Sequence, residues 1–231
     1  MRPQLIDGLD PARVCAALAP LIAPERRARI EVVLAARLSG LTVVLENLSN
    51  PQNGAAAVRS CEAAGVQAIH VIEGRARFRF SPKVTQGCQR WLDLTRYRAS
   101  ADAVRTLRAG GFVLAAALPE AEKSLDALDG AERLALCFGN EHTGLSEAVR
   151  AAADLSFALP MVGMTRSLNL SVAVALAVNT AAARRRDALR AGGDLDPAAR
   201  AALRARWYAA DVRGAEAVLR RAGVIAGKHA G

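Results

Sequence analysis

The sequence predicts an α/β fold with a mainly parallel sheet. Short apolar runs alternate along the chain with segments whose apolar residues recur at helical spacing. Polar, glycine-containing turns follow several of these runs, and ligands of parallel sheets bind beyond the carboxyl ends of the strands. With 231 residues, the chain is long enough to bury one sizeable core and to carry short appendages.

Five short apolar runs are the predicted strands. Each is bounded by turn residues, as expected for strands buried in a sheet. The runs are residues 41–45, 68–72, 112–118, 134–138 and 155–159.

Helical periodicity predicts the segments between and beyond these strands. In residues 26–38, Ile30, Leu34 and Leu38 share one helical face, and we expect Gly40 to end this helix. The other predicted helices are residues 55–64, 101–109, 145–153, 170–186 and 198–208.

Composition limits the class of protein. The chain is 52% apolar and 23% charged, which is typical of a globular protein and not of a disordered one. No apolar run is long enough to span a bilayer, and the N-terminus lacks a signal-peptide core, so we expect a cytoplasmic protein. Four widely spaced cysteines without a Cys-x-x-Cys pair predict reduced thiols and no metal site.

Positive charge is concentrated towards the ends of the chain. The formal net charge is +9, and residues 184–231 alone contain 11 basic and 5 acidic residues. A further basic cluster lies in residues 75–98. A compositional preference for arginine on solvated helix faces would explain this pattern, but clusters on several segments are also typical of phosphate contacts.

A polar turn follows the predicted strand 41–45. It reads Asn-Pro-Gln-Asn-Gly at residues 50–54 and leads into the helical segment that contains Arg59. A helix-capping asparagine and an exposed arginine would explain the turn structurally. In the alternative interpretation, Asn53 orients the guanidinium of Arg59, which holds an RNA phosphate or a reacting hydroxyl.

A second turn follows the predicted strand 134–138. Gly139 ends the strand, Glu141 and His142 come next, and a helix is expected to begin near Gly144. Glycine allows a ligand to approach the backbone closely, although an ordinary strand-to-helix turn would look the same. We expect His142 to be a surface histidine, because no cluster of partner residues accompanies it.

The most informative stretch reads LPMVGMTRSLNLSVA and joins the last predicted strand to an apolar helix. Backbone groups left free at a helix start can hold a ligand. The main chain of this loop could surround an adenine, with Leu159, Met161 and Leu168 as apolar walls. Ser167 and Asn169 would supply hydrogen bonds.

Several common nucleotide and hydrolase motifs are missing from the sequence. It has no Gly-x-Gly-x-x-Gly after a strand, no Gly-Lys-Ser/Thr phosphate loop and no Gly-x-Ser-x-Gly elbow. Dinucleotide enzymes, P-loop NTPases and α/β-hydrolases are therefore poorly supported.

Taken in order and at their spacing, the three turns resemble the three signature motifs of the SpoU/TrmH branch of the SPOUT RNA methyltransferases. The likeness covers about residues 26–186. It implies a SPOUT fold with a C-terminal deep trefoil knot, a rare exception to the rule against threaded chains. It also implies a homodimer whose subunits build the site jointly, and S-adenosyl-L-methionine bound in a bent shape within the knot.

The resemblance divides the chain into three segments. Residues 1–39 would form a basic helical N-terminal arm, residues 40–186 the methyltransferase domain and residues 187–231 a basic helical C-terminal extension. The implied reaction is methyl transfer to a ribose 2′-OH of tRNA, at guanosine 18 in the D-loop. A ribosomal RNA ribose methyltransferase, a noncatalytic RNA-binding protein with this fold and an unrelated nucleotide-binding α/β protein stay open as alternatives.

The resemblance also assigns roles to individual residues. Arg59 would be catalytic and Asn53 would position it, while Glu141 would shape the site across the dimer interface. Ser167 and Asn169 would complete the cofactor loop and its link to Arg59. The implied cofactor contacts are Ala116, Gly139, Leu159, Met161 and Leu168. At Ala116 only a contact through the main chain is implied. The implied RNA contacts are Arg26, Arg27, Arg29, Arg90, Arg166, Arg184 and Arg185.

Overall fold

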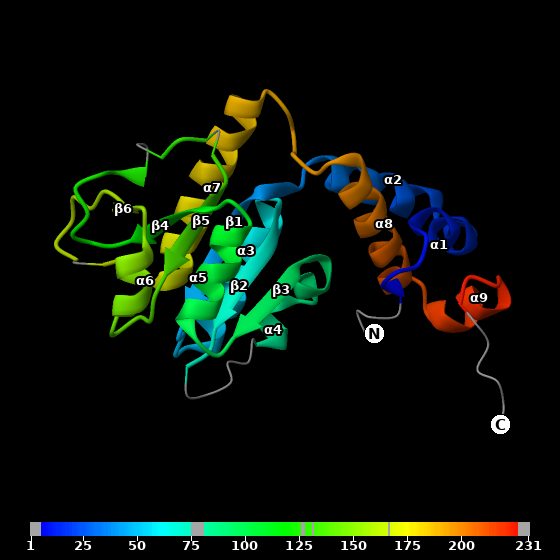
Figure 1. The fold of residues 1–231 in the computed structure, drawn as a ribbon, viewed down its shortest axis with the longest axis horizontal. Helices are drawn as coiled ribbons and strands as arrows, with labels where there is room; N and C mark the ends of the chain where they lie inside the picture. Colours follow the sequence, from blue (N-terminus) through cyan, green and yellow to red (C-terminus); the bar gives the residue numbers. More distant parts are fainter. Residues whose placement is uncertain (1–5, 75–80, 126–127, 131, 166, 226–231) are drawn as a thin grey trace. The chain divides into compact units, whose positions relative to one another are not determined.

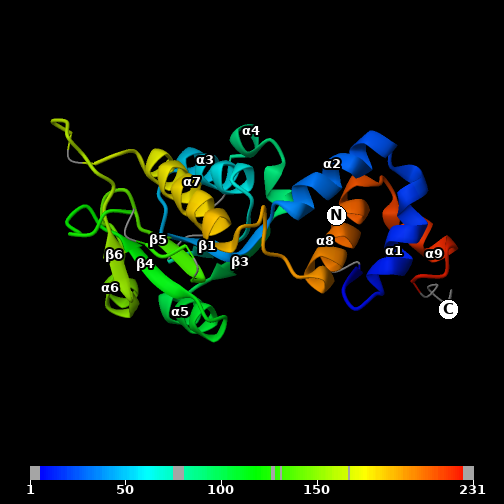
Figure 2. The ribbon, with the colours of Figure 1, turned by 90° about the horizontal axis from the view of Figure 1, so that it is seen from above.

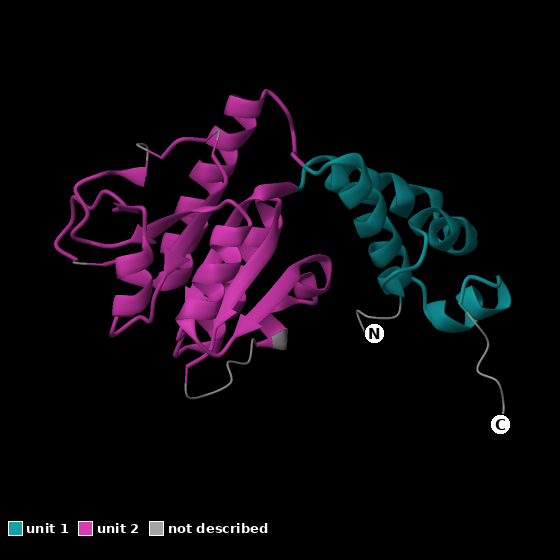
Figure 3. Ribbon diagram, viewed as in Figure 1, with its two compact units in different colours: residues 1–37, 195–231 teal, residues 38–194 magenta. Residues whose placement is uncertain are grey.

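The computed structural model describes residues 6–74, 81–125, 128–130, 132–165 and 167–225. The chain divides into two compact units, which Figure 3 colours separately. One unit comprises Leu38–Asp194, and the other combines the two ends of the chain, Met1–Arg37 and Leu195–Gly231.

A parallel sheet forms the centre of the unit Leu38–Asp194 (Figure 1). Within the described residues it has six strands in the order β3-β2-β1-β5-β4-β6, and every neighbouring pair is parallel. The strands are β1 (Leu38–Glu46), β2 (Val66–Ile72), β3 (Asp93–Tyr97), β4 (Val113–Ala117), β5 (Leu134–Phe138) and β6 (Leu155–Phe157).

Helices cover both faces of this sheet. Figure 2 shows α3 and α7 on one face, with α5 and α6 on the other. Neighbouring residues of β1 point to opposite sides, since Val43 packs in the core under α3 and α7 while Val44 packs in the core under α5 and α6. The helical segments are α3 (Pro51–Ala63), α4 (Pro82–Thr85), the 3₁₀ turn η3 (Cys88–Trp91), α5 (Ser100–Ala109), α6 (Glu147–Ala152) and α7 (Leu170–Leu189).

Side-chain caps begin the three helices that follow the three predicted motifs. The Asn50 side chain accepts from the backbone N–H of Gln52 at 2.8 Å at the start of α3. Ser146 caps α6, and the Asn169 side chain accepts from the backbone N–H of Ser171 at 2.8 Å at the start of α7. Such caps satisfy N–H groups that have no partner inside the helix.

The terminal unit is helical. Its core is built from apolar side chains of helices from both ends of the chain, including Val14, Leu34, Leu203 and Leu219. The guanidinium of the buried Arg37 lies 5.0 Å from the centre of the Trp207 ring. The helices are α1 (Pro11–Leu18), the 3₁₀ turn η2 (Ala19–Leu21), α2 (Pro24–Ala35), α8 (Pro197–Asp211) and α9 (Ala215–Arg221).

The predicted parallel α/β fold is confirmed, and all five predicted strands are present. The strand β3 was not predicted, because Asp93–Tyr97 lies at the sheet edge and mixes polar with apolar residues. The helices α1 and α9 were not predicted either. Among the described residues, no helix combines the length and apolarity needed to cross a bilayer.

Two element boundaries correct the prediction. The helix expected at residues 26–38 ends at Ala35, and Gly40 lies inside β1 instead of ending a helix. A Cβ atom at Gly40 would lie 1.9 Å from a guanidinium nitrogen of Arg185, so the glycine makes room for that side chain. In addition, α7 continues to Leu189, past the predicted domain boundary at residue 186. The assignment of three functional segments stays a prediction.

Candidate functional site

The first and second motif turns leave the same edge of the sheet side by side. Leu45 of β1 is in register with Phe138 of β5, and each strand runs into its motif turn within a few residues. Parallel neighbouring strands end at one edge, so the loops that follow them are brought together. This edge carries the polar residues of the candidate site.

A chain of side-chain hydrogen bonds joins all three motifs. Asn53 donates through Nδ2 to Oε1 of Glu141 at 3.0 Å. Asn169 donates through Nδ2 to Oδ1 of Asn53 at 3.1 Å. Asn53 therefore lies between the second and the third motif and contacts both through one amide.

The Glu141 carboxylate is also bonded to the turn before α3. Its Oε2 accepts from the hydroxyl of Ser49 at 2.8 Å and from the Ser49 backbone N–H at 3.1 Å. Burial by itself raises the pKa of Glu141, but the hydrogen bonds from Asn53 and Ser49 outweigh burial and lower it below its usual value. Glu141 is therefore an anion at neutral pH.

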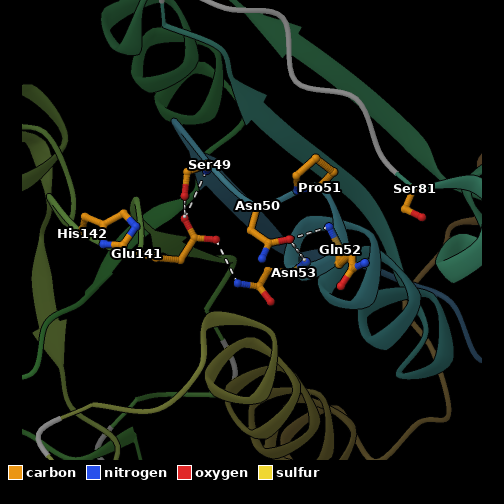
Figure 4. Close-up of a pocket in the computed structure, with 8 residues that line it drawn as sticks. All are labelled: Ser49, Asn50, Pro51, Gln52, Asn53, Ser81, Glu141 and His142. Carbon is orange, nitrogen blue, oxygen red and sulfur yellow. Dashed lines mark hydrogen bonds between the residues drawn. The ribbon is translucent and has the colours of Figure 1, made fainter.

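A cavity of about 730 Å³ opens beside this network (Figure 4). Figure 4 shows Glu141 between Ser49 and Asn53, to which its two oxygens are bonded. The cavity is large enough for a nucleoside. Its lining residues are Ser49, Asn50, Pro51, Gln52, Asn53, Ser81, Glu141 and His142.

Two predicted catalytic residues lie outside the hydrogen-bonded network. Arg59, on α3, and Ser167 are both exposed, and within the described residues the Arg59 side chain has no hydrogen bond or ion pair. No bond between Asn53 and Arg59 is present there, so the predicted positioning of Arg59 by Asn53 stays a prediction. As expected, His142 is exposed, although it lines the cavity.

Three of the predicted cofactor residues, Ala116, Gly139 and Leu159, lie at or just beyond the ends of β4, β5 and β6. Ala116 is buried and in register with Cys137 of β5 and Ser156 of β6. Leu159 and Leu168 are half-buried, and Met161 is 36% exposed. These strands are neighbours in the sheet, so the loops that follow them share one edge.

The fold of the second motif turn explains why residue 139 is a glycine. A Cβ atom at this position would lie 2.1 Å from the carbonyl carbon of Gly144, so the turn leaves no room for a side chain. The predicted cofactor contact of Gly139 stays a prediction. Backbone hydrogen bonds of 3.0 and 2.9 Å between Asn140 and Gly144 close this turn. The glycine is required by the fold of the second motif.

One of the predicted RNA contacts is corrected by the structure. Arg185 is 7% exposed, and its guanidinium donates to Asp194 at 2.5 Å and to the carbonyl of Glu132 at 2.7 Å. A buried and fully engaged guanidinium cannot reach an RNA phosphate, so its role is structural. Arg166 lies outside the described residues.

The remaining predicted RNA contacts differ in how exposed their side chains are and in their partners within the protein. Arg29 and Arg90 are exposed, although Arg90 stacks 4.4 Å from the Trp91 ring centre. Arg26 is ion-paired with Asp211 at 2.8 Å, and Arg184 donates to the carbonyl of Leu128 at 3.3 Å. Arg27 is half-buried. Among these, Arg29 and Arg90 are the most accessible to a phosphate.

Sequence reasoning did not single out Ser49, Asn140 or Glu46. The Asn140 amide donates to the carbonyl of Asn47 at 2.6 Å and ties the first two motifs together. Glu46 is buried at the end of β1. A carboxylate directly after the apolar run Val43–Leu45 of a buried strand was the signal that could have identified Glu46. Within the described part of the chain, no group of three or more His, Cys, Asp or Glu residues is arranged to hold a metal ion.

Comparison with known proteins agrees with this site. Residues 40–179 match the SpoU rRNA Methylase family. The chain is 39% identical over 160 residues to the tRNA (guanosine(18)-2′-O)-methyltransferase of Borreliella burgdorferi, which covers 69% of this chain and 73% of that protein.

Two solved structures extend the likeness to the fold. The A. aeolicus TrmH/SpoU tRNA modifying enzyme superimposes with a TM-score of 0.73 at 26% identity, over 82% of this chain and 98% of that chain. The SpoU methyltransferase AviRb from Streptomyces viridochromogenes, in complex with the cofactor AdoMet, has a TM-score of 0.58 at 27% identity, over 67% and 64% of the two chains. The match of the three motifs, the sheet and the sequence together show that this chain belongs to the SpoU methylase family.

Proposed function

We propose that this chain transfers a methyl group from S-adenosyl-L-methionine to the ribose 2′-OH of guanosine 18 in tRNA. The observation that carries the proposal is the hydrogen-bonded chain from Glu141 through Asn53 to Asn169, because it joins the three motifs beside a nucleoside-sized cavity. The name of the Borreliella burgdorferi relative supports both the reaction and the nucleotide.

The predicted cofactor residues suit the adenosine part of the methyl donor. Ala116, Gly139 and Leu159 lie at or just beyond the ends of three neighbouring strands, and the five residues of the set include no titratable side chain. The apolar side chains of this set suit an adenine ring. When bound, S-adenosyl-L-methionine supplies a methyl group on a positively charged sulfur, which is a good leaving group.

We assign Arg59 to the RNA backbone and not to proton removal. A guanidinium stays protonated at physiological pH and has no acceptor site, so it cannot take the proton of a hydroxyl. An arginine fork can clamp a phosphate through two hydrogen bonds and thereby orient the neighbouring ribose. The hydroxyl proton would leave to water as the new bond to oxygen forms.

Exposed apolar side chains support a homodimer as the working form. Val162 and Met164 are as exposed as in an extended chain, at 104% and 101%, and Val172 and Leu176 of α7 are about half exposed. Soluble proteins use such patches for association. A second copy would also bring groups to Arg59 and Ser167, which are exposed in a single chain.

The knot and the terminal segments belong to the same proposal. We place a deep trefoil knot in the C-terminal part of residues 40–186, and we assign RNA binding to the two basic ends and to the accessible arginines, without Arg185. All four cysteines lie in the described residues and form no disulfide, which fits a reducing compartment, and we propose the cytoplasm.

Incubation with labelled methyl donor tests the function. Purified protein is given separate tRNA and ribosomal RNA pools, and the methylated nucleoside is mapped by mass spectrometry. We expect 2′-O-methylguanosine at position 18 of tRNA. Label confined to ribosomal RNA would overturn the substrate, and donor binding without label in any RNA would favour a noncatalytic RNA-binding protein.

A further inference from the structure

The Glu46 carboxylate is fully buried, and the site described above does not use it. Its Oε2 accepts from the backbone N–H of Ser146 at 2.7 Å, and its Oε1 accepts from the Ser146 hydroxyl at 2.7 Å. The Ser100 hydroxyl also donates to Oε1, at 2.5 Å. Three elements, β1, α5 and α6, therefore meet at one carboxylate.

These bonds attach the second motif loop to the end of β1. Residues 140–146 are held at their start by the Asn140 amide, which donates to the carbonyl of Asn47 at 2.6 Å. They are held at their end by Ser146, which is bonded to Glu46. The two ends of this loop are therefore bonded to consecutive residues of the chain, Glu46 and Asn47. Glu141 lies in the loop between these two fixed ends.

A buried carboxylate is a costly way to stabilise a fold. Removing a carboxylate from water is unfavourable unless hydrogen bonds satisfy it, and apolar residues often stabilise a core equally well. What the carboxylate adds is geometry, because two oxygens at a fixed separation set the positions of one backbone N–H and two hydroxyls. Glu141 depends on that geometry, since its hydrogen bonds to Ser49 and Asn53 cross between loops.

We propose that Glu46 is a positioning residue for methyl transfer, which holds residues 140–146 so that Glu141 reaches Asn53. The proposal rests on the proposed function, because it names a residue that supports the same reaction. Glu46 is neither one of the residues that line the cavity nor one of those predicted to hold S-adenosyl-L-methionine. Its effect on the reaction therefore passes through Ser146 and the loop to Glu141.

Two conservative variants of Glu46 separate the effect of side-chain length from the effect of negative charge. Glu46→Gln keeps the length of the side chain, and its amide can bond the same three groups once the hydroxyls rotate. Glu46→Asp keeps the charge but shortens the side chain by one carbon and withdraws the anchor from Ser146. We expect Glu46→Asp to lower kcat about 100-fold, as misplacement of about 1 Å can do, with KM for tRNA nearly unchanged. Glu46→Gln should keep most of the activity.

Thr42→Val provides the matched control. Thr42 is buried in the same strand, and its hydroxyl donates to the carbonyl of Ala68 at 2.7 Å, away from the motif loop. We expect this variant to lower the unfolding temperature while kcat is retained. A loss of kcat in Thr42→Val equal to that in Glu46→Asp would reduce Glu46 to a structural residue and overturn the proposal.

A double variant tests whether Glu46 acts through Glu141. If it does, Glu46→Asp should have no further effect on kcat in a Glu141→Ala background, because the two changes remove the same interaction. Effects that multiply would overturn the proposal while leaving the methyltransferase function intact.

Hydrogen exchange supplies a measurement that does not depend on turnover. In Glu46→Asp, the backbone amides of residues 140–146 should exchange faster than in the wild type, with those of β2 unchanged. Unchanged exchange in the loop would contradict the proposal even if no RNA substrate were methylated. Failure of the wild type to methylate tRNA, with the expected exchange, would refute only the proposed function.

Discussion

At the scale of single residues, the site depends on one amide. Asn53 uses its nitrogen towards Glu141 and its oxygen towards Asn169, at 3.0 and 3.1 Å. An amide is suited to this place because it donates at one end and accepts at the other. The three motifs are held together by a residue that could have been a simple helix cap, whereas the cap of α3 is Asn50.

Asn53→Asp tests this central position. The change replaces a donor by a second carboxylate facing Glu141, so repulsion should open the link between the first two motifs. We expect methyl transfer to fall about 100-fold, while binding of S-adenosyl-L-methionine, measured by calorimetry, changes little. Ser60→Ala is the control, because the Ser60 hydroxyl on the same helix donates to the carbonyl of Ala56 at 3.0 Å and Ser60 does not line the cavity. Near-normal turnover of Asn53→Asp would contradict the proposed role of Asn53 in joining the three motifs.

The ionisation of Glu141 gives a pH dependence with a definite sign. Its pKa in the folded protein is below the ordinary value of 4.5, so the carboxylate network adds stability that is fully present above that value. This stability is lost as the pH falls below 4.5 through the folded pKa.

Glu141→Gln makes this contribution measurable. The difference in unfolding free energy between the wild type and the variant should be constant above about pH 5 and shrink towards lower pH, because protonated Glu141 resembles glutamine. Urea unfolding at a series of pH values checks this. A difference that grows on acidification would contradict the assigned direction of the shift.

At the scale of secondary-structure elements, Arg185 of α7 packs against the first residues of β1. Arg185 lies against Gly40 of β1 and is ion-paired with Asp194, whose carboxylate also accepts from the Gly40 backbone N–H at 3.0 Å. The C-terminal end of α7 is thereby tied to the first residues of β1. Charge counting along the chain cannot distinguish such a residue from a phosphate ligand.

Arg185→Ala tests the corrected role. Removing the guanidinium leaves Asp194 as a mostly buried charge without its ion-pair partner, and we expect a loss of about 3–5 kcal/mol of unfolding free energy. Arg29→Ala is the control, since Arg29 is exposed and its loss should leave stability unchanged. Chemical denaturation measures both. An unaltered midpoint in Arg185→Ala would restore Arg185 as a candidate RNA contact.

At the scale of the whole molecule, the described residues expose several large apolar side chains. Val172 and Leu176 are 45% and 49% exposed and lie one turn apart on α7, and Met164 of the third motif is 101% exposed. Val172 and Leu176 share one face of α7, the helix that directly follows the third motif in the sequence. The proposed dimer would therefore complete the site and cover this face together.

Leu176→Glu tests the dimer. A charge in the centre of an apolar interface should dissociate it, so sedimentation should give a monomer and methyl transfer should fall with it. Leu189→Glu is the control, because Leu189 is 38% exposed near the end of the same helix, on another face. A Leu176→Glu protein that remains dimeric and active would show that this face is not the interface.

Local pattern was sufficient for most of the elements. Buried strands such as Leu134–Phe138 are continuous apolar runs between turn residues, and the prediction matched this strand at both ends. The edge strand Asp93–Tyr97 was missed because its residues are half-buried or exposed and its pattern of polar and apolar residues is mixed. The helix boundary at Ala35 was missed because Leu38 continues the helical spacing although it belongs to β1.

The sequence by itself determined the alternation of strands and helices, the three polar turns and the family they resemble, because periodicity and turn chemistry act between residues close in the chain. Tertiary structure alone decided which polar groups meet. It assigned Asn53 to Glu141 and Asn169, Glu46 to Ser146, and Arg185 to the core. These partners are brought together only when parallel strands align their ends and helices pack across them, so their hydrogen bonds have no local signature.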